Sequence, residues 1–168
     1  HHSGLPGDIV KGMWRGQPAP FQSVVALLAE EYLAYPPRTI HSYSNLGADL
    51  LGVMLERVSG TEYETVMQEL VLKPLGMTNS SYNLQPHIAR KLSQGYNEKG
   101  QWEKDVAIRD VPAGNLYTSV NDLGKMMIML LNYGVYGGTE VLPADLVKEM
   151  FRAQNDEVLL DGNFKIGY

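Results

Sequence analysis

Tyr43 and Asn45 are the two side chains of this sequence whose types and spacing best suit chemistry. They flank Ser44 just before a predicted helix, and residues two apart in an extended segment point to the same side of the chain. The free amides and the positive end of the helix would face the same spot. A tyrosine hydroxyl placed there, beside a lysine, can move protons, while an asparagine amide can bind the same ligand. The pair is therefore a candidate acid–base site.

A structural interpretation of the same residues is also open. Tyr43 is one of ten tyrosines in the chain, and a tyrosine often packs its ring against neighbouring side chains. Asn45 is a good residue for the N-cap of a helix. Local chemistry alone favours this packed tyrosine followed by a cap, so the catalytic interpretation needs further support.

Five helices are expected to position this pair, and one of them begins at it. Apolar spacing predicts a helix over residues 45–59, and Gly60 suits a left-handed C-terminal cap. Thr61 and Glu64 have the form of a capping box that opens the next helix, to about residue 72. The remaining predicted helices cover residues 21–34, ended by Pro36-Pro37; residues 120–132, opened by a capping box from Ser119 to Asp122; and residues 143–151, started by Pro143.

Strand signals are few and short. Residues 92–96 and 102–108 are predicted as the arms of a hairpin, and residues 164–168 resemble the inside of a strand. The fold class expected is mainly α with a few short strands. The chain starts at His1 rather than at a methionine, and we expect it to be one segment, residues 1–168, of a longer protein.

Composition narrows the function classes. The 168 residues have a formal net charge of −5, which disfavours nucleic acid or an anionic membrane as the main partner. There is no cysteine, and the four histidines lack metal-ligand spacing, so neither a metal nor a cofactor is expected. The longest apolar runs are far shorter than the ~18 residues of a transmembrane helix. No serine lies in a Gly-x-Ser-x-Gly elbow.

A longer resemblance supports the catalytic interpretation. The order of motifs resembles the middle of the β-lactamase-related serine hydrolases, a family of class C β-lactamases, DD-peptidases and esterases with the penicillin-recognising fold. The matching segments, in the family's order, are His2-Ser3-Gly4-Leu5-Pro6, Tyr43-Ser44-Asn45-Leu46-Gly47, Leu51-Gly52, Val58-Ser59-Gly60-Thr61, Pro74-Leu75-Gly76-Met77 and Pro112-Ala113-Gly114-Asn115-Leu116-Tyr117-Thr118-Ser119 with Asn121-Asp122-Leu123.

The family's active site combines three motifs, of which this sequence contains one. Tyr43-Ser44-Asn45 matches the Tyr-x-Asn motif, but none of the nine serines is followed by lysine at the third position. The Lys/His-x-Gly motif is also missing from its place downstream. The resemblance therefore implies an internal, largely helical portion of a β-lactamase/transpeptidase-like α+β fold, with the nucleophilic serine outside this chain.

By this resemblance, the parent enzyme would cleave an amide, an ester or a β-lactam through an acyl-enzyme, and this chain alone would be inactive. Tyr43 would assist proton transfer at the serine, and Asn45 would bind the substrate's amide or orient the motif's lysine. Many relatives work in the bacterial envelope, and the substrate stays open. The alternative is a non-catalytic helical module that binds a peptide or associates with itself through exposed apolar surface.

Overall fold

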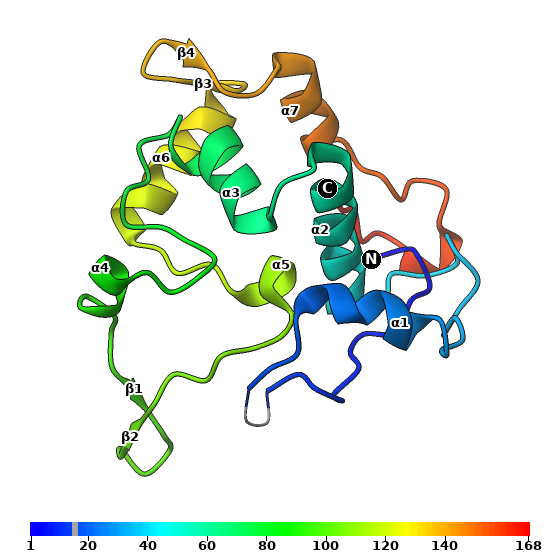
Figure 1. Ribbon diagram of the computed structural model, residues 1–168. Helices are drawn as coiled ribbons and strands as arrows, with labels where there is room; N and C mark the ends of the chain where they lie inside the picture. Colours follow the sequence, from blue (N-terminus) through cyan, green and yellow to red (C-terminus); the bar gives the residue numbers. More distant parts are fainter. Residues whose placement is uncertain (15–16) are drawn as a thin grey trace.

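The computed structural model describes residues 1–14 and 17–168, and helices dominate this part of the chain (Figure 1). The longest helix, α2 (Asn45–Ser59), lies next to the short helix α5 (Val111–Gly114), while α3 (Tyr63–Met67) and α6 (Val120–Leu131) lie together beyond them. Both chain termini lie beside α2. Among the described residues, no helix has the length and apolar character needed to cross a membrane.

Helix α2 has the predicted bounds and the predicted end. Gly60 follows it at a φ of 68°, and its amide donates to the Glu56 carbonyl oxygen at 2.8 Å. This left-handed conformation suits glycine because a side chain there is strained. Gly52 in the middle of α2 has a different role. A Cβ at that position would lie 2.4 Å from Pro112 Cγ, so glycine is what lets α5 approach α2 closely.

The first predicted helix is wrong in its length. A 3-10 turn (Phe21–Ser23) continues into α1 (Val24–Leu28), and the helix ends well before residue 34. The chain then runs toward the N-terminal segment, where the Ala34 amide donates to the Gly4 carbonyl oxygen at 2.8 Å. Tyr32 is 90% exposed, so the apolar spacing beyond α1 does not mark a buried face.

The helix that follows α2 ends near residue 72, as predicted, but it begins at Tyr63 and is capped by other groups than predicted. Helix α3 is followed by one π-helical turn (Gln68–Leu72). The predicted capping box at Thr61 does not form. Instead, the Tyr63 amide donates to Glu56 Oε1 at 2.8 Å, and the Glu64 carboxylate accepts from the Tyr82 amide at 2.7 Å and the Asn83 amide at 2.8 Å. Long-range partners therefore replace the local cap.

Near the C-terminal end, two helices are confirmed with small changes. Ser119 Oγ accepts from the Asp122 amide at 3.2 Å and caps α6, whereas the Asp122 carboxylate does not reach back to complete the box. Pro143 is the N-cap of α7 (Ala144–Phe151) rather than its first residue. The helix α4 (Pro86–Ala89), like α5, is a single turn that the periodicity did not predict.

Two hairpins supply the strands. Strands β1 (Gly95–Tyr96) and β2 (Trp102–Glu103) pair antiparallel where a hairpin was predicted, but with shorter arms. Strands β3 (Val135–Tyr136) and β4 (Thr139–Glu140) form an unpredicted hairpin, turned by Gly137 and Gly138 at positive φ. Residues 164–168 form no strand. They run beside α7, where the Tyr168 amide donates to the Met150 carbonyl oxygen at 2.9 Å.

The buried apolar side chains form two clusters. One packs α2 against α1 and α3 around Phe21, Val24, Leu46, Val53 and Tyr63. The other joins the chain after α3 to α6 through Leu72, Leu75, Met77 and Met129. The first cluster fixes the helix that begins at the candidate site.

Candidate active site

Ser44 fixes the start of α2 and holds the N-terminal segment against it. Its side chain is buried, and its Oγ accepts from the Gly47 amide at 3.1 Å and lies 2.7 Å from the Pro6 carbonyl oxygen, to which it donates. Ser44 is thus the N-cap, and Asn45, which the structural interpretation placed in that role, is the first helical residue. The Asn45 side chain is left available for other contacts.

Tyr43 and Asn45 are both held by residues 1–8. The Tyr43 ring stacks on the His1 ring with centroids 4.5 Å apart, and its side chain stays 60% exposed. Asn45 Nδ2 donates to Asp8 Oδ1 at 2.8 Å, and the Asn45 amide donates to the Gly7 carbonyl oxygen at 3.0 Å. The predicted pair therefore lies at one exposed corner, at the N-terminal end of α2.

Asp8 belongs to the geometry of the candidate site and was not predicted from the sequence. Its carboxylate accepts a hydrogen bond from the Asn45 Nδ2, which leaves the Asn45 oxygen to accept a hydrogen bond from a ligand or a neighbouring lysine. The signal available in the sequence was its place just after the His-Ser-Gly-Leu-Pro segment. Nothing local in the sequence pairs Asp8 with a residue 37 positions later.

Hydrogen bonds join the N-terminal segment that contains His1 and His2 to residues 155–161 near the C-terminus. Asp161 accepts from the His41 amide at 2.7 Å, from Asn155 Nδ2 at 2.6 Å, and contacts His2 Nε2 at 2.7 Å. Burial acts to raise the pKa of Asp161, but the hydrogen bonds from Asn155, His2 and the His41 amide outweigh it and bring the pKa to about 2. Asp161 therefore stays ionised and ties the two terminal segments together beside Tyr43.

A groove of about 880 Å³ starts at this corner. It runs from His1 and Ser44 along one side of α2, past Leu51 and Met54, to Phe151 on α7 and to the C-terminal residues. Its walls are mainly apolar, and His1 and Ser44 line its polar end. Tyr43 and Asn45 flank Ser44 in the chain but do not themselves line the groove. Among the described residues, no group of three or more histidine and acidic side chains is arranged to hold a metal ion.

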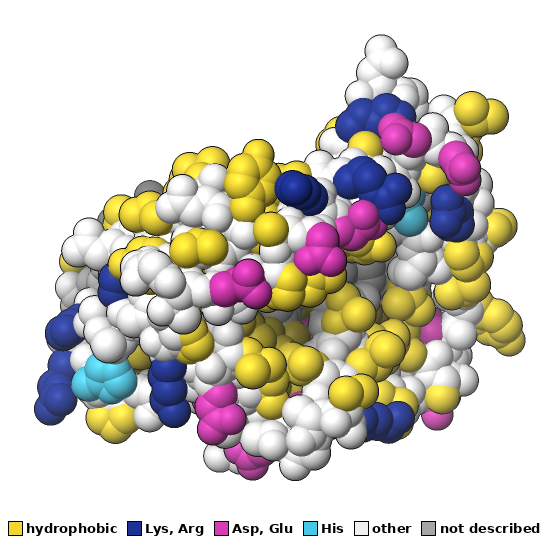
Figure 2. All heavy atoms as spheres, turned by 90° about the horizontal axis from the view of Figure 1, so that it is seen from above, with side chains coloured by type: hydrophobic (Ala, Val, Ile, Leu, Met, Phe, Trp, Pro, Cys, Tyr) yellow, Lys and Arg dark blue, Asp and Glu magenta, His cyan; other side chains and the backbone are white. Residues whose placement is uncertain are grey.

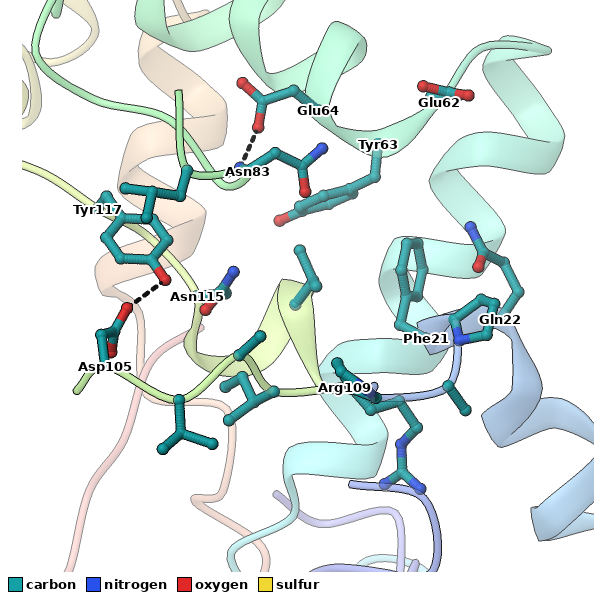
Figure 3. Close-up of a pocket in the computed structure, with 18 of the residues that line it drawn as sticks. Phe21, Gln22, Glu62, Tyr63, Glu64, Asn83, Asp105, Arg109, Asn115 and Tyr117 are labelled. Atoms are coloured by element: carbon teal, nitrogen blue, oxygen red, sulfur yellow. Dashed lines mark hydrogen bonds between the residues drawn. The ribbon is translucent and has the colours of Figure 1, made fainter. Parts of the chain in front are cut away.

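A second pocket, of about 800 Å³, lies between residues 18–22, α3 and residues 104–117 (Figure 3). It is lined by neither Tyr43 nor Asn45, nor by a residue adjacent to them in the chain. Two of its acidic groups serve structural roles: Glu64 accepts from the Asn83 amide, and Asp105 accepts from the Tyr117 hydroxyl at 2.7 Å (Figure 3). Burial and Asp105 raise the pKa of Tyr117 to about 12, so it is a neutral phenol near pH 7. We therefore place the candidate site at Tyr43.

Replacing Ser44 with alanine tests how the site is assembled. The substitution removes the cap of α2 and leaves the Gly47 amide and the Pro6 carbonyl without a partner, so we expect the free energy of unfolding to fall by about 1–2 kcal/mol. Urea unfolding measures this. Ser93→Ala, at an exposed serine, should leave the value nearly unchanged; equal values for the two variants would contradict the role given to Ser44.

Comparison with known proteins identifies the family. The family model described as Beta-lactamase matches residues 1–167. The unguisins hydrolase ungD of Aspergillus violaceofuscus is 30% identical, over 79% of this chain and 26% of that protein. A putative D-alanyl-D-alanine carboxypeptidase of Escherichia coli O157:H7 is 26% identical, over 100% of this chain and 44% of that protein.

Solved structures agree in fold. The penicillin-binding protein from Bacillus halodurans matches with a TM-score of 0.75 at 23% identity, covering 100% of this chain and 52% of that one. A putative β-lactamase from Bacteroides dorei matches with a TM-score of 0.65 at 26% identity, covering 92% and 40%. The chain thus spans between about a quarter and half of the length of these relatives, and it belongs to the Beta-lactamase family of hydrolases.

Proposed function

We propose that this chain supplies the Tyr-x-Asn part of the active site of a serine hydrolase that cleaves an amide, an ester or a β-lactam through an acyl-enzyme. The observation that carries the proposal is the exposed corner where residues 1–8 hold both Tyr43 and Asn45, next to Ser44 and His1, which line the polar end of an apolar groove. In this proposal the chain is the internal helical portion of an α+β catalytic domain, because its relatives are about two to four times longer.

Each residue has a proposed task. The Tyr43 hydroxyl, which has no hydrogen-bond partner among the described residues, takes part in moving the proton of the attacking serine. The oxygen of the Asn45 carboxamide accepts from the substrate's amide or from the lysine of the first motif. Asp8 holds that carboxamide in the required orientation through its contact with Nδ2. Asp8 is therefore a positioning residue rather than a catalytic one.

The groove offers a place for the missing Ser-x-x-Lys segment. Apolar side chains on α2, α6 and α7 remain exposed, among them Leu51 at 66%, Met54 at 59%, Leu131 at 72% and Phe151 at 63%. On the face drawn in Figure 2, hydrophobic side chains border a hollow. Exposed apolar surface of this extent is typical of a surface that another segment covers. A helix seated in the groove of α2 would place its serine and lysine near the end that His1 and Ser44 line, next to Tyr43.

The isolated chain and the full-length protein should differ completely in activity. We expect purified residues 1–168 not to turn over a chromogenic cephalosporin or a p-nitrophenyl ester, because the sequence lacks a nucleophile with a partner lysine. The full-length protein should turn over at least one of them. Turnover by a contaminant-free sample of the isolated chain would contradict the proposal, and so would a full-length reading frame without Ser-x-x-Lys.

The exposed apolar side chains also favour one alternative, a non-catalytic module that binds a peptide or a second copy of itself. Analytical ultracentrifugation of residues 1–168 and of the full-length protein separates the two proposals. If the isolated chain associates and the full-length protein does not, the apolar surface is covered by another segment of the same molecule, as the enzyme proposal expects. Association that persists through the same face of the full-length protein supports the module. A bacterial envelope location is part of the enzyme proposal, by analogy with its relatives.

A further inference from the structure

A buried cluster of two carboxyl groups and one guanidinium lies where α2 meets α5. Asp49 is on α2, while Arg109 and Asp110 immediately precede α5, and all three side chains are at most 2% exposed. Asp49 follows Asn45 by one helical turn, so the two lie on the same face of α2. The proposed catalytic function does not use this cluster.

The hydrogen bonds of the cluster leave Asp49 without a cationic partner of its own. Arg109 Nε donates to Asp110 Oδ1 at 2.5 Å, and Arg109 Nη1 donates to the Lys11 carbonyl oxygen at 2.8 Å. Both Asp49 oxygens, Asp110 Oδ2 and Arg109 Nη2 are buried, and none of these atoms makes a hydrogen bond of normal distance and angle with a described group. A buried acceptor without a partner is costly, and an unpaired buried charge costs more.

Counting charges indicates how the cluster can be stable. One guanidinium balances one carboxylate, so the cluster is neutral only if the second carboxyl group holds a proton. Like charges at close range cannot both ionise without a penalty, and one proton between two carboxyl groups also supplies the missing hydrogen bond. Because that proton belongs to a coupled pair, its titration is a property of both residues.

We propose that Asp49 and Asp110 share one proton and that this carboxyl pair is a pH-sensitive joint that positions α2, and with it Tyr43 and Asn45, against α5. The close approach of the two helices at Gly52 and Pro112 leaves little room for water to enter and solvate a second negative charge. Loss of the proton would therefore push α2 and α5 apart near the start of α2. The inference does not depend on the proposed function.

Other charged groups around Asp49 do not remove the need for the proton. Burial first, and then the charge and hydrogen bond of Asp110, raise the pKa of Asp49 to about 7, while Arg109 and the Ala113 amide offset only part of this. Tyr63, from α3, is a further titratable group near Asp49. Burial and the neighbouring Tyr82, Asp49 and Glu64 raise the pKa of Tyr63 above its usual value, so it stays neutral.

The direction of the pH effect follows from these shifts. The folded chain keeps the proton up to about pH 7, whereas the unfolded chain releases it near pH 4. Between these values the folded state binds more protons, so this pair makes the chain most stable at the acidic end of the range. That stability is lost as the pH rises toward 7 and above.

The test compares thermal unfolding of residues 1–168 from pH 5 to pH 8.5 with that of Asp49→Asn. An asparagine is neutral and can donate to Asp110, so it imitates the protonated form. We expect the Tm of the unsubstituted chain to fall by about 5 °C or more over this range. Asp49→Asn should show a smaller fall and a higher Tm at pH 8.5. Asp145→Asn, at an exposed carboxylate on α7, should follow the unsubstituted chain.

A carbon-13 NMR titration of the aspartate carboxyl groups keeps the test independent of whether the variant folds. We expect one of the pair to titrate near pH 7, and the amide signals of residues 45–49 to shift with the same midpoint. Titration of both Asp49 and Asp110 near pH 4 would overturn the proposal. The proposal would also be overturned if the Tm of the unsubstituted chain and that of Asp49→Asn changed with pH in the same way. If the Tm depended on pH but the amide signals of residues 45–49 did not shift with the same midpoint, the positioning role would be wrong.

Discussion

Replacing Tyr43 with phenylalanine in the full-length protein should lower kcat/KM by a factor of about 10² to 10⁴, the usual contribution of a group that transfers a proton in the transition state. Phenylalanine keeps the ring that stacks on His1 and removes only the hydroxyl. Because Tyr43 is 60% exposed and its hydroxyl has no partner among the described residues, the Tm should hardly change. Steady-state kinetics together with thermal unfolding measure both effects.

Tyr32→Phe is the matched control for this substitution. Tyr32 is 90% exposed and lies outside the Tyr43 corner, so losing its hydroxyl should change neither kcat/KM nor Tm. If Tyr43→Phe also left the kinetics unchanged, Tyr43 would be a packing residue and its proposed role in proton transfer would be wrong. A loss of activity accompanied by an equal loss of stability would likewise argue against a chemical role.

Replacing Asp122 with asparagine should have the largest effect on stability. The Asp122 side chain is 1% exposed and accepts from the Asn79 amide at 2.8 Å, Ser80 Oγ at 2.9 Å and Lys125 Nζ at 2.9 Å. Asparagine brings two donors into a site built entirely of donors and leaves Lys125 without a counter-charge. We expect the free energy of unfolding at pH 7 to fall by about 2–4 kcal/mol, measured by urea unfolding.

The stability that Asp122 contributes depends on pH in the opposite direction to that of Asp49. Burial acts to raise the pKa of Asp122, but the hydrogen bonds from Lys125, the Asn79 amide and Ser80 outweigh it, so the pKa lies below its usual value. The stability it contributes is present above about pH 4 and is lost as the pH falls through the lower, folded-state pKa. The difference in free energy of unfolding between the unsubstituted chain and Asp122→Asn should therefore shrink as the pH falls. Asp145→Asn should differ little from the unsubstituted chain at any pH. A difference that stayed constant down to pH 2 would contradict this account.

Local signals predicted the helices that local contacts determine. The N-terminal side of α2 and its end at Gly60 could be predicted because Ser44, Gly47 and Gly60 interact within the helix and its caps. The start of α3 could not be predicted, since the group that caps it is Glu56 on the preceding helix. Likewise, α1 ends early because Ala34 pairs with Gly4, a contact that the helical periodicity does not contain.

Part of the geometry of the candidate site could be predicted. The sequence paired Tyr43 with Asn45, and the structure holds both at one corner through residues 1–8. Asp8 and the Asp49–Asp110 pair were missed, because each depends on residues that are distant in sequence and meet only in the fold. The family motifs pointed to the candidate pair, whereas burial and hydrogen bonding in the structure show which groups hold it in place.

The most direct test of the central claim is the intact mass of the full-length protein after reaction with a slowly hydrolysed β-lactam or with a fluorophosphonate. The account predicts a single covalent adduct on the serine of a Ser-x-x-Lys motif outside residues 1–168, lost when that serine is replaced by alanine and formed more slowly in Tyr43→Phe. No adduct on the folded full-length protein with either reagent, or an adduct on one of the nine serines within residues 1–168, would contradict it.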